Sequence, residues 1–349
     1  MLNVGIIGAG HISESHIKSY QANGNCVIKA IADLNLKNAQ KRAAEFGIEK
    51  AYDNYWEILN DASIDAVSVA TPTFTHKGIV IDALNSGKHV LCEKPPALNA
   101  DEVQACVEAA KKSGKLLMYG LVLRFRPQTR YLKEFVDAGK MGAFVSADCV
   151  RVSLCSSAES WFASRAKGGG ILRDAAIHEI DNVLYLMGYP KPKVVVANQS
   201  FVNRDLPKKL GGGWESYDTN QYENDVESAI EGFVTLDNGA SIRVKTAAIL
   251  TSVDPIRSIT IDGEKASVKI QGGVAGNHDL KILELVDDHY VEAVPWLSKK
   301  VPFREEINHF VDCCLNGTEC ICKPEEAIAL MQIIDAMYES AETGKPVVF

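Results

Sequence analysis

The sequence has no long apolar run, since none of its segments approaches the roughly 20 residues that a helix needs to cross a bilayer. Its first residues, MLNVGIIGAG, also lack the basic segment that opens a secretory signal. We therefore expect a cytoplasmic protein with no membrane partner.

The sequence also lacks an excess of positive charge. The formal net charge is -8 at pH 7, and no segment concentrates lysine and arginine. Proteins that bind nucleic acid usually carry a basic patch or stripe. We therefore expect no nucleic-acid partner.

The cysteines do not indicate a disulfide framework. They number nine, an odd count, and are scattered along the chain, which suits reduced thiols. The densest stretch is CCLNGTECIC, with Cys313, Cys314, Cys320 and Cys322. Structural zinc sites usually hold cysteine pairs about two to four residues apart, and neither the adjacent pair nor C-x-C fits this spacing well. We expect buried thiols here and no metal.

What is present is a repeating β-α pattern. The 349 residues, 46% of them hydrophobic, can form two packed domains. From Leu2 to about Leu121, short β-branched runs alternate with helical stretches, which predicts a doubly wound parallel sheet of the Rossmann type. The expected strands are 3–8, 27–33, 65–71, 89–93 and 115–120, and the expected helices lie near 12–22, 36–46, 75–86 and 99–113.

After Leu121 the alternation stops. Helical pieces near 128–138 and 171–187 precede strand-like runs between about 193 and 293, and helical stretches at 304–317 and 324–344 close the chain. The turn signal Asp237-Asn238-Gly239 between two β runs predicts an antiparallel hairpin. We expect a dinucleotide-binding domain at 1–122 and an α+β domain at 123–349. The Gly-rich stretch 210–225 is expected to be an exposed recognition loop.

The stretch GAGHIS, residues 8–13, is a candidate dinucleotide-binding turn that includes His11 and Ile12. Gly8 suits a tight turn, Gly10 a close approach of backbone to pyrophosphate, and Ser13 replaces the usual third glycine. Asp33 follows about 20 residues on, where a carboxylate bonds the adenosine ribose. This carboxylate favours NAD over NADP. A plain strand-to-helix turn is the alternative.

Further candidates stand where two other strands end. Thr71 and Pro72 are expected to line the cofactor, and so are Glu93 and Lys94 of CEKPP, because ligands of an open α/β sheet bind at the carboxyl edge. The Lys94-Pro95 bond can be cis at such a turn. His76 is a further cofactor candidate, although a structural role is favoured for it. The alternative for Lys94 is an ordinary solvated lysine.

The segment GGGILRDAAIHEID, residues 168–181, sets polar groups at helical spacing in an apolar run. Asp174 and His178 are four residues apart and share one helix face, which Asp181 continues. A carboxylate one turn from a histidine can orient the imidazole and raise its basicity, as a general base requires. The three glycines would let the backbone approach a ligand or another element closely. The alternatives are a solvent-facing polar stripe or a buried Asp-His pair that serves stability only.

The chain resembles, over nearly its whole length, the Gfo/Idh/MocA family of glucose-fructose oxidoreductase, inositol dehydrogenase and rhizopine-catabolism proteins. The motifs that carry the resemblance are GAGHIS, Asp33, ATPTFTH, KHVLCEKP, YGLVLRFRP, WFASRAKGGGILRDAAIHEID and YESAETGKPVVF. The resemblance implies a Rossmann domain followed by an α+β domain, whose large, mainly antiparallel open sheet commonly forms dimers or tetramers.

The resemblance also implies roles for individual residues. Lys94 is expected to contact the reacting hydroxyl, His178 to act as the base, and Asp174 to be its partner and a substrate ligand. Residues expected in or near the substrate pocket are Arg124, Trp161 and Arg165.

Three functions compete at this point. The first is an NAD-dependent dehydrogenase that oxidises a secondary hydroxyl of a cyclic polyol, inositol or sugar, or runs the reverse reduction. The second uses transient oxidation to assist elimination or glycoside cleavage, with no net redox change. The third is a regulator that binds NAD and a sugar without catalysis, although a sensor has no need for both Lys94 and His178.

Overall fold

The computed structural model describes residues 1–153, 160–202, 224–248, 256–272 and 279–349. They form two compact units, of which the first comprises Met1–Phe125 with Lys300–Ile328, and the second comprises Arg126–Lys299 with Ala329–Phe349. Residues 300–328, which were expected in the second domain, pack in the first unit. The domain boundary itself stays a prediction.

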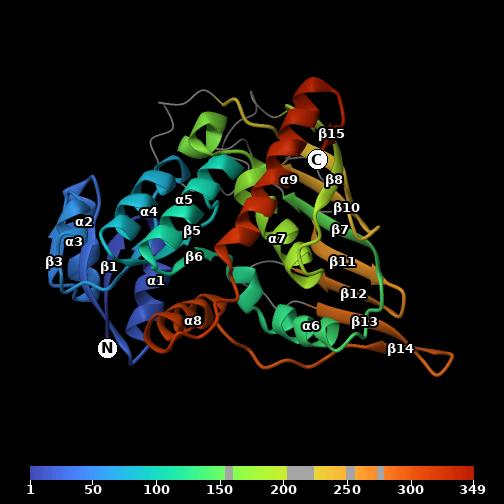
Figure 1. The fold of residues 1–349 in the computed structure, drawn as a ribbon, viewed down its shortest axis with the longest axis horizontal. Coiled ribbons are helices and arrows are strands. Elements are labelled where there is room, and N and C mark those ends of the chain that lie inside the picture. The colour runs from blue at the N-terminus through green and yellow to red at the C-terminus, as the bar shows by residue number, and fades with distance from the viewer. Residues whose placement is uncertain (154–159, 203–223, 249–255, 273–278) are drawn as a thin grey trace. The chain divides into compact units, whose positions relative to one another are not determined.

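The first unit is built on a six-stranded parallel sheet in the order β3-β2-β1-β4-β5-β6. Figure 1 labels β1, β3, β5 and β6 of this sheet. Its strands are β1 (Leu2–Ile7), β2 (Cys26–Ala32), β3 (Lys50–Tyr52), β4 (Ala66–Val69), β5 (His89–Glu93) and β6 (Leu117–Gly120). The order reverses between β1 and β4, which is the switch point where open α/β sheets bind their ligands. The Rossmann prediction is confirmed.

Most helices of this unit lie close to the expected positions, but the short helix α3 was not expected. They are α1 (His11–Gln21), α2 (Leu36–Phe46), α3 (Trp56–Leu59), α4 (His76–Asn85), α5 (Ala100–Ser113) and α8 (Pro302–Asn316), with 3-10 turns η1 (Thr73–Thr75) and η2 (Val122–Phe125). Local signals set the ends of α5: the Asn99 side chain accepts from Glu102 N–H, and Gly114 closes the helix at φ 67. Helix α8 packs on α1, where the Phe303 ring lies 6.4 Å from that of His16.

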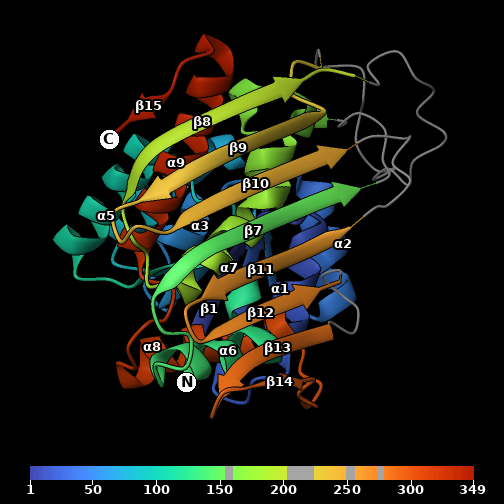
Figure 2. The same ribbon diagram turned by 90° about the vertical axis from the view of Figure 1, so that its right-hand side faces the viewer.

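The second unit holds a nine-stranded sheet in the order β14-β13-β12-β11-β7-β10-β9-β8-β15 (Figure 2). Its strands are β7 (Phe144–Ser153), β8 (Pro192–Ser200), β9 (Ala229–Leu236), β10 (Ser241–Ala248), β11 (Arg257–Gly263), β12 (Ala266–Gln271), β13 (Asp279–Val286), β14 (His289–Ala293) and β15 (Val347–Val348). The described pairs are antiparallel apart from β7 with β10. The prediction of a large, mainly antiparallel sheet is confirmed.

The turn between β9 and β10 is the one expected. Gly239 has φ 88, and its N–H donates to Leu236 O at 3.2 Å, so the two strands join as an antiparallel hairpin. Their side chains alternate, with Val234 buried and Phe233 44% exposed. One sheet face is therefore packed and the other carries exposed side chains.

Helices of the second unit are α6 (Pro127–Asp137), α7 (Ile177–Leu186) and most of α9 (Pro324–Thr343), with 3-10 turns η3 (Ser160–Ala163) and η4 (Arg165–Lys167). Helix α7 packs against β7 and β11. Among the described residues, no helix has the length and apolar character that crossing a membrane requires. Most of the predicted recognition loop, residues 210–223, lies outside the described residues.

Candidate active site

The turn after β1 has the geometry that a pyrophosphate requires. Gly8 has φ +102, and a Cβ at this position would lie 2.3 Å from the carbonyl oxygen of Ala70. Gly10 is the N-cap of α1 and has no side chain to cap its first turn, so the amide end of the helix can face an anion. Ser13 is buried, and its hydroxyl donates to Gly10 O at 2.6 Å. The departure from the third glycine is thus accommodated inside the turn.

Asp33 lies directly after β2, beside this turn. One carboxylate oxygen accepts the N–H of Ala9 at 2.9 Å, and the other accepts the N–H of Asn35 at the same distance. The carboxylate is thereby fixed at the sheet edge where a ribose would bind. Together with the Gly8 turn, these residues fit a dinucleotide.

Lys94 follows β5 at the same edge and is half-buried. The Lys94-Pro95 peptide is cis, as the sequence suggested. The backbone N–H of Lys94 donates to Glu93 at 3.1 Å, and the buried Glu93 carboxylate lies 2.7 Å from Nε2 of His16. Burial alone would raise the pKa of Glu93, but the hydrogen bond and charge of His16 hold it below its ordinary value.

A second carboxyl, that of Glu306 on α8, is buried beside His16 and Glu93. The ligand atoms of these three residues all lie within 4.8 Å of one another. Burial and the neighbouring Glu93 carboxylate raise the pKa of Glu306 well above its ordinary value. Two carboxyls so close cannot easily both ionise, so Glu306 carries the proton and Glu93 the charge. Sequence reasoning missed Glu306 and His16, because neither stands in a motif.

Near the ends of β4 and β5, the ring of His76 forms a hydrogen bond with the backbone of Thr71. The His76 ring is buried, with Nε2 2.8 Å from Thr71 O and Nδ1 2.8 Å from Pro95 O. Burial lowers the pKa of His76. The ring links the chain after β4 to the chain after β5, which supports the structural role. A direct contact of His76, Thr71 or Pro72 with a cofactor stays a prediction.

Asp174 and His178 stand at the start of a buried helix, but its first turn differs from the expectation. Residues Leu172–Ala176 form a π-helical turn, closed by the Ile177 N–H donating to Leu172 O, and the α-helix begins only at Ile177. A π turn is wider than an α turn and is frequent at functional sites. His178 is buried, and Asp181 accepts a hydrogen bond from the hydroxyl of Tyr189. The polar stripe is thus largely enclosed by protein.

The three glycines before this helix let other elements of the second unit approach. A Cβ on Gly169 would lie 2.2 Å from Phe162 O, and one on Gly170 would lie 2.6 Å from the hydroxyl of Tyr338. Gly170 also has φ +108, a conformation that favours glycine. The glycines therefore serve close packing with another element, which is one of the two uses foreseen.

Buried Glu227 organises the start of this segment and was also missed. Its Oε1 accepts the N–H of Leu172 and the hydroxyl of Tyr338, each at 3.0 Å. Arg165 lies 3.5 Å from the other oxygen, donates to Gln199 at 2.7 Å, and stacks 4.4 Å over the Tyr338 ring. The guanidinium of Arg165 is therefore engaged with protein groups.

The other two residues predicted to contact substrate have different surroundings. The Arg124 side chain is fully buried, donates to Ile321 O at 2.7 Å and pairs with Glu326. These contacts support a structural role. The Trp161 ring is half-buried and stacks on that of Phe162, with centroids 3.8 Å apart. Substrate contact by Arg124, Trp161 and Arg165 stays a prediction.

Glu179, which follows His178, forms ion pairs with two arginines, and a third arginine, Arg126, lies nearby. Its carboxylate accepts from Arg257 Nε and lies 3.8 Å from Arg151 Nη1. Burial and repulsion by Arg257 lower the pKa of nearby Arg126 to about 9. The spacing of these arginines along the chain carries no signal, so sequence reasoning did not find this cluster.

The fold and the cofactor turn define an NAD-binding oxidoreductase, and comparison with known proteins leads to the same class. A family model described as "Oxidoreductase family, NAD-binding Rossmann fold" matches residues 2–121, and one described as "Oxidoreductase family, C-terminal alpha/beta domain" matches residues 133–349. The chain belongs to the Gfo/Idh/MocA oxidoreductase family. The predictions of the family, an enzyme and NAD as cofactor are confirmed.

Individual relatives are similar over almost their whole length. D-glucoside 3-dehydrogenase of Escherichia coli (strain K12) is 29% identical over 98% of this chain and 96% of its own. The scyllo-inositol 2-dehydrogenase (NAD(+)) of Bacillus subtilis (strain 168) is 27% identical over 98% and 94%. The structure of a levoglucosan dehydrogenase in complex with NADH matches with a TM-score of 0.86 at 24% identity, over 99% of this chain and 98% of that one.

Proposed function

We propose that this oxidoreductase transfers a hydride between NAD and a secondary hydroxyl of a cyclic polyol, inositol or sugar. The observation that carries the proposal is the position of Lys94 at the carboxyl end of β5, the sheet edge that also holds Gly8 and Asp33. A cation at this edge can meet a substrate oxygen next to the cofactor. The names of the relatives, which are dehydrogenases of a glucoside and of inositols, support this substrate class.

The proposed roles follow from the chemistry of the side chains. NAD, when bound, supplies the hydride acceptor. The ammonium of Lys94 binds the substrate hydroxyl and stabilises negative charge on its oxygen, and His178 takes the hydroxyl proton. Asp174 orients the imidazole and contacts the substrate. Glu93, held by His16, fixes the backbone from which Lys94 extends.

The experiment that tests the proposal follows nicotinamide absorbance with the purified protein. Inositols, hexoses, pentoses and their keto forms are each supplied with NAD and with NADP. Reduction of NAD by a cyclic polyol or sugar is the expected result. If the protein binds NAD but no compound changes the absorbance, the redox-neutral enzyme or the sensor replaces the dehydrogenase.

We further propose that the exposed face of the nine-stranded sheet forms a homodimer or homotetramer. Val196 and Phe233 are cross-strand partners on β8 and β9 and are 46% and 44% exposed, and Leu283 on β13 is 42% exposed. The adjacent pair Val196 and Phe233, exposed on an open sheet, indicates a surface that a partner can cover. A cytoplasmic location and the lack of a nucleic-acid partner stay predictions from composition.

A further inference from the structure

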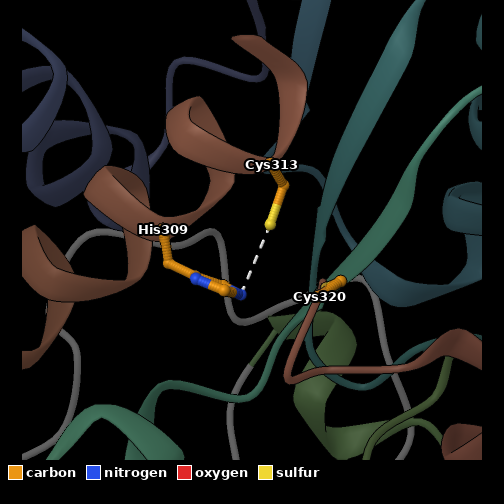
Figure 3. Close-up of side chains that lie close together, drawn as sticks. All are labelled: His309, Cys313 and Cys320. Carbon is orange, nitrogen blue, oxygen red and sulfur yellow. Dashed lines mark hydrogen bonds between the residues drawn. The ribbon is translucent and has the colours of Figure 1, made fainter. Parts of the chain in front are cut away.

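A cluster of metal-binding side chain types lies in the first unit, apart from the cofactor turn. His309 and Cys313 stand one helical turn apart on α8, and Cys320 stands on the chain that follows this helix. Figure 3 shows His309 and Cys313 pointing toward one another, with Cys320 beside them. The three potential ligand atoms all lie within 4.8 Å of one another. Residues from two segments therefore converge on one point.

The spacing of the atoms suits a tetrahedral metal ion. Cys313 Sγ lies 3.4 Å from Nε2 of His309. In a tetrahedral zinc site, with bonds of about 2.3 Å to sulfur and about 2.0 Å to nitrogen, sulfur and nitrogen ligands lie about 3.5 Å apart. The helix thus holds its two side chains at nearly the separation that zinc imposes, so Cys313 and His309 need little rearrangement.

The hydrogen bond that His309 accepts also suits a ligand. Its Nε2 accepts the N–H of Ile321 at 3.0 Å, so this nitrogen carries a lone pair that a metal ion can take in place of the hydrogen bond. The Cys320 thiol donates to Cys322 O at 3.3 Å. Metal binding replaces both hydrogen bonds, and the thiols of Cys313 and Cys320 each release a proton to water. A shift of the short segment 320–321 is the rearrangement required.

We propose that His309, Cys313 and Cys320 bind a zinc ion, with water as the fourth ligand. Two thiolates and one imidazole form a donor set that selects zinc over magnesium or calcium. His309 and Cys320 are only half-buried, so solvent can reach the fourth position, whereas Cys313 is buried. The ion would tie residues 317–323 to α8.

The spacing of the cysteines did not indicate zinc, because neither the pair Cys313 and Cys314 nor the pair Cys320 and Cys322 has the usual separation. The ligands are instead a histidine four residues before one cysteine, with a second cysteine seven residues further on. The adjacent Cys314 and the C-x-C partner Cys322 are not in this set. The spacing becomes meaningful only once α8 is known to end at Asn316, after which the chain turns back past the helix.

The test is the metal content of the full-length protein, purified with a tag free of histidine, in reducing buffer without chelator. The expected result is about one zinc per chain in the unaltered protein. Cobalt(II) added to chelator-treated protein is expected to give thiolate charge-transfer bands and the intense visible bands of a tetrahedral ion. Zinc is also expected to raise the melting temperature by a few degrees.

The variants Cys320→Ser, Cys313→Ser and His309→Asn should each lose the zinc and the cobalt bands. Cys26→Ser, which alters a half-buried thiol elsewhere in the first unit, should keep both. Cys320 lies in a partly exposed loop, so its variant is the least expected to disturb folding, and NAD titration checks that it is folded. Absence of zinc and of cobalt bands from the unaltered protein overturns the proposal. So does zinc that persists in Cys320→Ser, or a Cys313–Cys320 disulfide in place of metal.

Discussion

The imidazole of His16 lies 2.7 Å from the carboxylate of Glu93, and both groups are buried in the first unit. The other ring nitrogen of His16 is 2.9 Å from Ser68 Oγ, which is 3.1 Å from the hydroxyl of Tyr20. This hydrogen-bonded chain reaches the backbone of Lys94 through Glu93. A buried polar chain of this kind fixes its members in one arrangement.

Glu306 beside this chain makes stability depend on pH. Its pKa is raised in the folded state above the value near 4.5 that it has when unfolded. Its stabilising contribution is therefore complete below that value and is lost as pH rises toward the folded pKa. Glu306→Gln cannot ionise and keeps the contribution. We expect the melting temperature of Glu306→Gln, relative to that of the unaltered protein, to increase as pH rises from about 5 to about 8.

The control for this prediction is Glu57→Gln, a change at an exposed glutamate of the same unit. Its melting temperature should follow that of the unaltered protein at every pH. A constant difference between Glu306→Gln and the unaltered protein across the range would contradict the assignment of the proton to Glu306.

Lys94→Ala and His178→Ala should abolish most turnover on the substrate that the absorbance panel identifies. General acid-base catalysis contributes about 100-fold to 10,000-fold, so kcat should fall by that order. NAD affinity, measured by fluorescence titration, should stay nearly unchanged. Lys115→Ala and His289→Ala are matched controls, because Lys115 precedes β6 and His289 is exposed on β14. Wild-type turnover in either Lys94→Ala or His178→Ala would refute the proposed proton handling.

Asp33→Asn should weaken NAD binding more than NADP binding. The carboxylate is expected to bond the ribose hydroxyls, and hydrogen bonds to charged groups contribute about 1.5–3 kcal/mol, which corresponds to roughly tenfold to a hundredfold in affinity. The dissociation constants for both cofactors provide the measurement. Asp101→Asn, at an exposed carboxylate in the first turn of α5, should leave both constants unchanged. If Asp33→Asn keeps the same preference for NAD over NADP, another group must distinguish the two riboses.

Gly170→Ala should destabilise the second unit. The new Cβ would meet the Tyr338 hydroxyl at 2.6 Å and Glu227 Oε2 at 2.9 Å, in a backbone conformation of φ +108. Strain of this kind costs about 1–3 kcal/mol, measurable by urea unfolding. Gly24→Ala, which meets nothing within 4 Å, should change the free energy of unfolding by at most about 0.5 kcal/mol. Equal effects of the two changes would be inconsistent with the packing described for Gly170.

A charge placed on the exposed sheet face should dissociate the proposed oligomer. Phe233→Glu adds a carboxylate opposite Val196, which would be buried unpaired if a second copy covers this face. Light scattering after gel filtration should show a smaller particle than for the unaltered protein. Lys41→Glu, at an exposed lysine of α2 in the first unit, provides a control that alters charge away from this face. An unchanged mass for Phe233→Glu would place the contact elsewhere or exclude it.

The fold could be predicted closely where buried runs and end signals agree. Strand β5 and helix α2 have the boundaries expected, since β5 is an apolar run and Gly47 ends α2 at φ 67. Strand β3 and helix α3 were missed because they hold three and four residues, too few to show a period. The π turn at 172–176 was missed because its spacing also fits an α-helix.

The candidate site could be predicted only where the chain itself carries a motif. The turn at Gly8 and the carboxylate of Asp33 are tied to a strand-turn-helix pattern. The partners of buried groups are not, since His16 and Glu93 stand 77 positions apart and Glu227 and Tyr338 stand 111 apart. Such pairs depend on how strands and helices pack, so a single sequence gives no sign of them.

The return of 300–328 to the first unit affects how the chain folds while it is being made. Helix α8 packs on α1, and the intervening residues 126–299 must leave the ribosome before it can do so. At about 5 to 20 residues per second this takes roughly 10 to 35 s. During that time α8 cannot cover the surface of α1 around His16, which stays exposed on the nascent chain.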